Sequence, residues 1–162
     1  MESSTIIEKL QDKLGDSLLK VENPDGIVTF ITRSESAITG IQFLKEQLGF
    51  EFLTDLCGIH YPDDALSFGI IYHLHNLKEN VRVRLKAFVP AEHPTILTAT
   101  GLFPAANWME RETFDFYGIL FEGHPNLKRI LNVDYLDYFP MRKEYPLEDP
   151  TRHDKDDRFF GR

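Results

Sequence analysis

Apolar and polar side chains alternate through the middle of the chain, and this alternation limits the possible fold more than any other feature. Alternation with a period of two is typical of β-strands that have one buried face. Three such stretches, separated by the turn-forming sequences PDDA and NLKEN, span residues 51–61, 66–75 and 80–89. We expect an antiparallel meander in which Tyr61 lies opposite Leu66 and His75 lies opposite Asn80.

This register divides the side chains of the meander between two faces. The apolar face, which we expect to be buried, carries Leu53, Cys57, Ile59, Phe68, Ile70, Tyr72, Leu74, Val81, Val83, Leu85 and Val89. The opposite face carries Thr54, Ser67, His73, His75, Arg82, Arg84 and Lys86. A shift by one residue would exchange the faces and bury the cations, so the pattern constrains the register.

Stretches with the helical spacing of apolar residues lie before and after the meander in the sequence. Helices are expected over 5–14, 35–48 and 104–117, ending at Gly15, Gly49 and Gly118. Short strands are expected over 18–21 and 27–32, joined by the turn NPDG. The sequence therefore predicts an α+β fold with an antiparallel or mixed sheet, two to three packed helices and an extended C-terminal tail.

The amino-acid composition of the chain changes after Gly118. Prolines recur at 125, 140, 146 and 150, and charged residues dominate after Tyr145. Such a segment cannot bury enough apolar surface to offset its ordering entropy alone. We therefore expect an α+β domain over 1–118, followed by an extended segment over 119–162 that is disordered or is ordered by packing on a partner.

Charge and cysteine content exclude several classes of function. The net charge is −8, which argues against nucleic acid or an anionic membrane as the main partner. The lone Cys57 excludes an internal disulfide and a cysteine-rich zinc or iron–sulfur site, and we expect it to be a small buried thiol. No apolar run approaches the roughly 20 residues of a membrane span, and we expect no signal or transit peptide at the N-terminus. Gly-rich phosphate-binding loops and nucleophile elbows are absent from the sequence.

Acidic, basic and aromatic side chains crowd into the expected helix 104–117. Apolar residues lie nearly all round the helix with charges between them, which is typical of a helix buried on more than one side. Arg111 and Asp115 have the spacing of an intrahelical ion pair, and buried charges must be paired. A partner interface and a network within the chain both satisfy this need. A small hydrolase using Glu112 or Asp115 with His124 is an alternative.

Two further patterns have weaker implications. His73 and His75 share a strand face and could bind a metal, but the expected register supplies no third ligand. Arg82, Arg84 and Lys86 form a basic stripe that could contact nucleic acid, solvent or an acidic partner.

The stretch from Trp108 to Leu131 resembles a known family signature. Glu110-Arg111-Glu112, Asp115-Phe116-Tyr117, His124, Lys128, Ile130 and Leu131 match it in type and spacing. The family is the C subunit, often called the 30 kDa subunit, of respiratory complex I, the proton-translocating NADH:quinone oxidoreductase. The likeness extends through MRKEYP near residue 145.

The resemblance implies a non-catalytic scaffold subunit of the peripheral arm. It implies no cofactor in this chain, with NAD, FMN, iron–sulfur clusters and quinone bound by partner subunits. The implied partners are the quinone-site D subunit and the iron–sulfur subunits B and I, on the cytoplasmic side of the bacterial inner membrane. The expected structural and interface residues are Trp108, Glu110, Arg111, Glu112, Asp115, His124, Lys128, Arg129 and Arg142.

Related subunits also serve membrane-bound hydrogenases and other donor:quinone oxidoreductases. The resemblance therefore leaves the electron donor open between NADH and the donors of those relatives.

Overall fold

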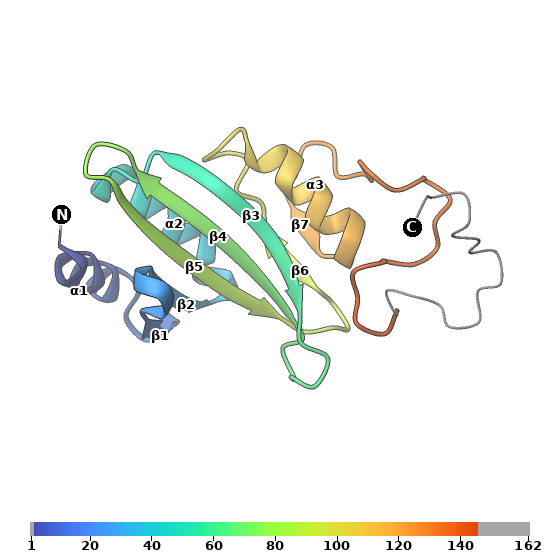
Figure 1. Ribbon diagram of the computed structural model, residues 1–162, viewed down its shortest axis with the longest axis horizontal. Coiled ribbons are helices and arrows are strands. Elements are labelled where there is room, and N and C mark those ends of the chain that lie inside the picture. The colour runs from blue at the N-terminus through green and yellow to red at the C-terminus, as the bar shows by residue number, and fades with distance from the viewer. Residues whose placement is uncertain (1, 146–162) are drawn as a thin grey trace, which may run out of the picture.

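The computed structural model describes residues 2–145 of the 162-residue chain. Its helices and strands follow one another in the order shown in Figure 1. The helices are α1 (Ser3–Leu14), α2 (Ser34–Leu48) and α3 (Ala106–Tyr117), with short 3-10 turns at Gly15–Ser17 and Pro24–Gly26. The strands are β1 (Leu18–Glu22), β2 (Val28–Arg33), β3 (Phe52–His60), β4 (Phe68–Asn76), β5 (Val81–Val89), β6 (Thr95–Leu97) and β7 (Leu120–Glu122).

A five-stranded sheet forms the centre of the molecule, in the order β1-β2-β5-β4-β3. The pairing of β2 with β5 is parallel and the other pairings are antiparallel, so the sheet is mixed. The parallel pairing requires a crossover, which α2 provides behind the sheet in Figure 1. The predicted α+β class with a mixed sheet is confirmed.

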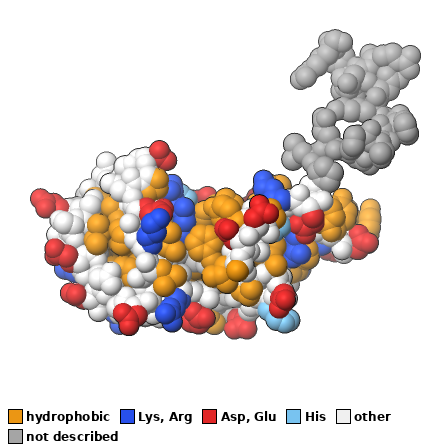
Figure 2. Space-filling view, turned by 90° about the horizontal axis from the view of Figure 1, so that it is seen from below, with side chains coloured by type: hydrophobic (Ala, Val, Ile, Leu, Met, Phe, Trp, Pro, Cys, Tyr) orange, Lys and Arg blue, Asp and Glu red, His pale blue; other side chains and the backbone are white. Residues whose placement is uncertain are grey.

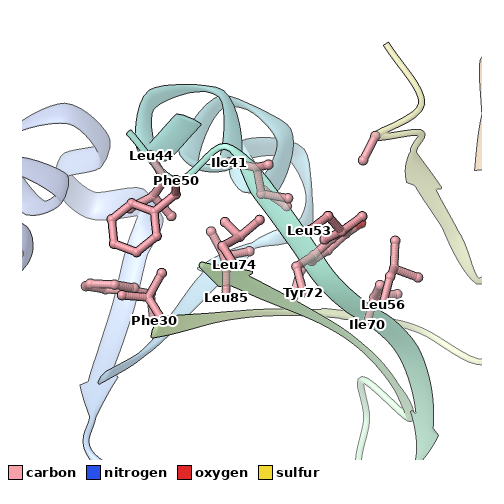
Figure 3. Close-up of a cluster of buried hydrophobic side chains, with 14 of the residues drawn as sticks. Phe30, Ile41, Leu44, Phe50, Leu53, Leu56, Ile70, Tyr72, Leu74 and Leu85 are labelled. Carbon is pink, nitrogen blue, oxygen red and sulfur yellow. The ribbon is translucent and has the colours of Figure 1, made fainter. Parts of the chain in front are cut away.

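The helices pack on one face of the sheet. Gly40 of α2 lies against Leu14 of α1 and Leu85 of β5, where an added Cβ would meet both side chains at 3.1–3.2 Å. Figure 3 shows the buried side chains between α2 and the strands, including Phe30, Leu74 and Leu85. Burial of these apolar side chains stabilises the fold by about 25 cal/mol per Å² of surface removed from water.

The third helix covers the other end of the same face, beside the edge strand β3. A Cβ at Gly58 would lie 2.7 Å from the ring of Tyr117 and 3.0 Å from Thr113. Gly58 lies opposite Ile70, whose side chain is in the core, so its missing side chain permits the close approach of α3. The ring of Phe68 meets that of Tyr117 edge-on at 6.5 Å.

The expected register of the meander is wrong in two places. His75 lies opposite Arg82, two residues from the expected partner, which leaves the faces unchanged. The backbone N–H of Tyr61 donates to the carbonyl of Ser67 rather than lying opposite Leu66, a shift of one residue.

That one-residue shift moves side chains of β3 from one face to the other. Cys57 and Ile59 lie opposite Ile71 and Gly69 on the face away from the helices, and Leu56 enters the core instead. Leu53 stays in the core because the pairing is irregular at Thr54, between Leu53 and Asp55.

A second, two-stranded sheet was not expected. β7 pairs in parallel with β6, and the side chains of Ile96 and Phe121 between them are buried. The chain just beyond Gly118 therefore contributes to the folded body.

Candidate functional site

Helix α3 buries charged side chains and exposes its tryptophan. Glu110 and Asp115 are fully buried and Arg111 nearly so, whereas Trp108 is 60% exposed and Glu112 is also exposed. The predicted burial on more than one side is therefore present, and the buried charges need partners. Their partners lie within the same chain, largely in residues 128–145, which we call the strap.

Asp115 binds the main chain of the strap. Its Oδ2 atom accepts hydrogen bonds from the backbone N–H groups of Ile130, Leu131 and Asn132 at 2.8–3.1 Å. Burial alone would raise the pKa of this carboxyl, but these N–H groups and Arg129 outweigh it and hold the pKa well below its usual value. Asp115 is therefore ionised at neutral pH and has no proton to donate as the general acid of a hydrolase.

Arg129 closes the same junction from the strap. Its Nη1 atom donates to Asp115 Oδ1 at 2.8 Å and to the Asp115 carbonyl at 3.0 Å. Its Nη2 atom donates to the carbonyls of Leu136 and Tyr138 at 2.8 and 3.1 Å. One guanidinium thus joins the helix to two later turns of the strap.

Arg111 also binds main-chain atoms, and the expected Arg111–Asp115 ion pair is wrong. Its Nε and Nη2 atoms donate to the carbonyls of Lys128 and Arg129 at 3.1 and 2.9 Å. Its guanidinium lies 5.3 Å from the centre of the Trp108 ring. The strap backbone is therefore held by an arginine through its carbonyls and by Asp115 through its amides.

The last turn of α3 holds the distal part of the strap. Arg142 Nε donates to the carbonyl of Tyr117 at 2.8 Å, and its guanidinium lies 4.9 Å from the ring of Phe68 and 4.8 Å from that of Phe139. Gly118 has φ of +76°, and a Cβ there would lie 2.6 Å from Phe139 and 2.7 Å from Arg142. Only glycine meets both conditions.

Sequence reasoning missed the role of His60 in this contact. The ring of His60 stacks on Phe68 at 4.5 Å, and its Nδ1 atom accepts a hydrogen bond from the backbone N–H of Lys143 at 2.9 Å. The expected register placed His60 opposite Ser67, and no motif marked it.

The remaining predicted residues occupy separate places. His124 Nδ1 accepts from the N–H of Asn126 at 3.0 Å, so Nε2 carries the proton and donates to the carbonyl of Asn107 at 3.1 Å. Both ring nitrogens are thus used in holding the turn after β7 against the start of α3. Lys128 contributes its carbonyl, and its residue is exposed.

Glu110 lies apart from the strap, facing the loop after β6. Its carboxyl accepts hydrogen bonds from the Thr98 hydroxyl and from the N–H of Ala99 at 2.6 Å. Burial raises its pKa to about 7, although both hydrogen bonds act in the opposite direction. Glu110 is therefore a buried group that titrates near neutral pH.

Cys57 is half-buried at the sheet edge rather than in the core. Burial and then Asp55 raise the pKa of its thiol to about 11, so it is protonated at neutral pH and a poor nucleophile. Across residues 2–145, no group of three His, Cys, Asp or Glu side chains has the arrangement of a metal site. No helix in the same residues is long and apolar enough to cross a bilayer.

Several large apolar side chains of the strap are exposed, although its backbone is held. The exposed large apolar residues of the strap are Leu131, Val133, Tyr135, Tyr138, Met141 and Tyr145. Leu131 is 66% exposed and Tyr135 is 86% exposed. In Figure 2 hydrophobic side chains reach the surface in several patches, one of them at the end of the molecule that carries the strap.

The chain is similar to known sequences of one protein family. The model of the family described as "Respiratory-chain NADH dehydrogenase, 30 Kd subunit" matches residues 30–151. The chain is 38% identical over 151 residues to the C subunit of the NADH-quinone oxidoreductase of Geotalea uraniireducens (strain Rf4), covering 93% of this chain and 92% of that protein. It is 46% identical over 125 residues to the second such C subunit of Rhizobium meliloti (strain 1021), covering 75% and 68%.

Solved structures give the same result. A structure described as "Nqo5 of the trypsin-resistant fragment (1-134) in P63 form" matches with a TM-score of 0.69 and 30% identity, covering 78% of this chain and all of that one. A chain of the membrane-bound sulfane sulfur reductase, an archaeal respiratory membrane complex, matches with a TM-score of 0.77. That second match, at 19% identity over 91% and 87% of the two chains, establishes similarity of fold alone. The chain belongs to the 30 Kd subunit family of the respiratory-chain NADH dehydrogenase.

Proposed function

We propose that this chain is the C subunit of a proton-translocating NADH:quinone oxidoreductase and acts there as a scaffold without catalytic residues of its own. In this role it holds the quinone-site D subunit and the iron–sulfur subunits B and I in fixed positions. NAD, FMN, iron–sulfur clusters and quinone are bound by partner subunits. The complex places the chain on the cytoplasmic side of the bacterial inner membrane.

The observation that carries this proposal is the strap. Residues 131–145 of the strap include six large apolar side chains that are exposed. An extended segment that buries so little apolar surface does not by itself offset the conformational entropy lost on ordering. Here Asp115, Arg111 and Arg129 hold its backbone, so the exposed side chains are pre-positioned before any partner arrives. Pre-organisation of apolar and tyrosine side chains is favourable for a protein interface.

The charged residues of α3 support this role by their contacts. Asp115 and Arg111 are fully engaged with the main chain, and both nitrogens of His124 are used in the same way. A hydrolase that paired Asp115 with His124 would need one of these two groups to be free for proton transfer.

The test compares two variants in a host that assembles the complex. Leu131→Asp with Tyr135→Asp places charge on the strap, and the control, Leu77→Asp, lies in the β4–β5 turn with similar exposure of 64%. Phe68 and Asn76 are the two ends of β4, so at about 3.3 Å per residue the control lies roughly 25 Å from the strap contact at Phe68.

The tagged chain is purified from detergent-solubilised membranes, and NADH:quinone reductase activity and iron are assayed in the eluate. We expect the strap variant to lose at least tenfold of both, while Leu77→Asp retains them. The thermal unfolding of the isolated strap variant should match that of the unaltered chain. Full recovery of activity and iron with the strap variant would reject the strap as the docking surface.

A further inference from the structure

The face of the five-stranded sheet away from the helices, which we call the open face, has no covering element among residues 2–145. The core side chains Phe30, Tyr72 and Leu85 all point toward the helices, and the alternate residues point the other way. Figure 1 looks onto this open face, with α2 behind the strands. A sheet face without a cover is common in antiparallel folds, where it is solvated and carries polar side chains.

The open face is cationic in an acidic protein. By register, its strand positions carry the cations Lys20, Arg33, Arg82, Arg84 and Lys86 and the acids Glu22 and Asp55. The whole chain has 18 basic and 26 acidic residues, so this face reverses the overall balance. Burial lowers the pKa of His73, and Arg84 and then Lys86 act in the same direction, whereas Asp55 opposes them.

The charges are also ordered across the strands. Arg84 lies on the central strand, while Glu22 on β1 and Asp55 on β3 lie at the two edges of the same row. With strands about 4.8 Å apart, each acid is roughly 10 Å from the centre. A nucleic acid or an anionic membrane presents negative charge throughout and would meet both acids. A folded protein can present a small acidic patch with cations around it.

Apolar side chains surround the central cations. Lys86 lies between Ile31 on β2 and Ile71 on β4, and Phe88 follows two residues later on the same strand. All four residues are half-buried. These apolar side chains beside the cations offer contact area that a protein surface can use and a phosphate group cannot.

We propose that the open face is a second docking surface, which binds an acidic patch of a neighbouring protein chain centred on Arg84 and Lys86. This inference extends the proposed function, because it requires an assembled complex, but it does not depend on the strap. Aspartate or glutamate side chains of the partner lie within ion-pair distance of Lys86.

The test uses a carbodiimide cross-linker, which joins an amine to a carboxylate only when the two are in contact. The complex is purified through a tag on this chain, treated with the cross-linker, digested and analysed by mass spectrometry. We expect a Lys86 peptide linked to an Asp- or Glu-containing peptide of another chain. Lys86→Arg keeps the charge but cannot form the amide, so the link disappears while the complex still assembles. Arg84→Glu should reduce the link at least tenfold.

Acetylation of lysines provides the second measurement. Lys86 should react at least tenfold more slowly in the complex than in the isolated chain. Equal reactivity in both, with Lys86 linked only to Glu22 of its own chain, would overturn the proposal. Protection that vanishes after nuclease treatment or lipid extraction, without an interchain link, would overturn it in favour of nucleic acid or lipid.

Failure of the chain to assemble with any partner would reject the proposed function itself. An unprotected Lys86 in an assembled, active complex would reject the open-face surface alone.

Discussion

The carboxylate of Asp115 and the guanidinium of Arg129 form a buried ion pair of 2.8 Å, and each also binds main-chain atoms of the other's segment. Asp115 is fully buried and the Arg129 side chain is 11% exposed. The pair therefore joins α3 to the strap within the chain, where the sequence left both a partner interface and an internal network open.

Asp115→Ala should destabilise the isolated chain by roughly 3–5 kcal/mol, because it leaves Arg129 and three backbone N–H groups without their acceptor. The free energy of unfolding is measured by urea denaturation. Glu112→Ala, an exposed acid on the same helix, is the control and should change stability by less than about 0.5 kcal/mol. An equally small effect at Asp115 would show that the pair contributes nothing to folding.

Arg111→Ala should lower the free energy of unfolding by roughly 1–3 kcal/mol. The loss is smaller than for Asp115→Ala because no buried carboxylate is left without a partner. The substitution removes donors to two carbonyls and leaves every described acid with its partners. The same urea titration measures the loss. A double-mutant cycle with Asp115→Ala should show coupling, since both side chains hold adjacent residues of the strap. Strict additivity of the two losses would contradict a shared role.

Gly118→Ala should loosen the strap. The added Cβ clashes with Phe139 and Arg142, and alanine is strained at φ of +76°. We expect a loss of at least about 1 kcal/mol and faster tryptic cleavage between Gly118 and Tyr145 in the isolated chain. Gly101→Ala is the matched control, because its Cβ would meet nothing within 4 Å. Identical cleavage rates in the two variants would count against the clash.

Glu110 should make the chain less stable as the pH rises toward neutrality. Its folded pKa of about 7 lies above the ordinary value of 4.5, so between these values the folded state keeps a proton that the unfolded chain has lost. Stability therefore falls from about pH 4.5 to 7, and the penalty remains above pH 7.

Glu110→Gln removes this titration while keeping an acceptor for the N–H of Ala99. At about 1.4 kcal/mol per pKa unit, the variant should gain up to about 3 kcal/mol over the unaltered chain at pH 8 and nothing near pH 4. Urea denaturation at several pH values measures this difference, with Glu112→Gln as the exposed control. Parallel stability curves for Glu110→Gln and the unaltered chain would contradict a raised pKa.

Helices and strands could be predicted from the sequence because their signals are local. The spacing of apolar residues and the terminal glycines Gly49 and Gly118 locate α2 and α3 closely, and both glycines adopt the left-handed conformation. The parallel pairing of β2 with β5 could not be predicted, since it joins residues more than 50 positions apart.

The details of the site could not be predicted, because they depend on tertiary contacts that leave no pattern in the sequence. A one-residue shift at β3, with an irregularity at Thr54, moved Cys57 out of the core and brought His60 to Phe68. Arg111 and Asp115 have the spacing of an ion pair, yet main-chain groups of the strap outcompete that pairing because they would otherwise be buried without partners. Arg129 and Asp115 were both named among the structural and interface residues, but their pairing was not predicted.

Arg111 holds two carbonyls of the strap, and the Oδ2 atom of Asp115 holds three of its amides. Apart from the Asp115–Arg129 pair, the path of the strap therefore depends on main-chain contacts and not on its exposed side chains. Any residue except proline can occupy positions 130, 131 and 132 and still donate its N–H to Asp115. Outward-facing residues such as Val133 and Tyr135 can therefore change together with a partner while the backbone keeps its course. The family signature in α3 can stay fixed while binding specificity diverges.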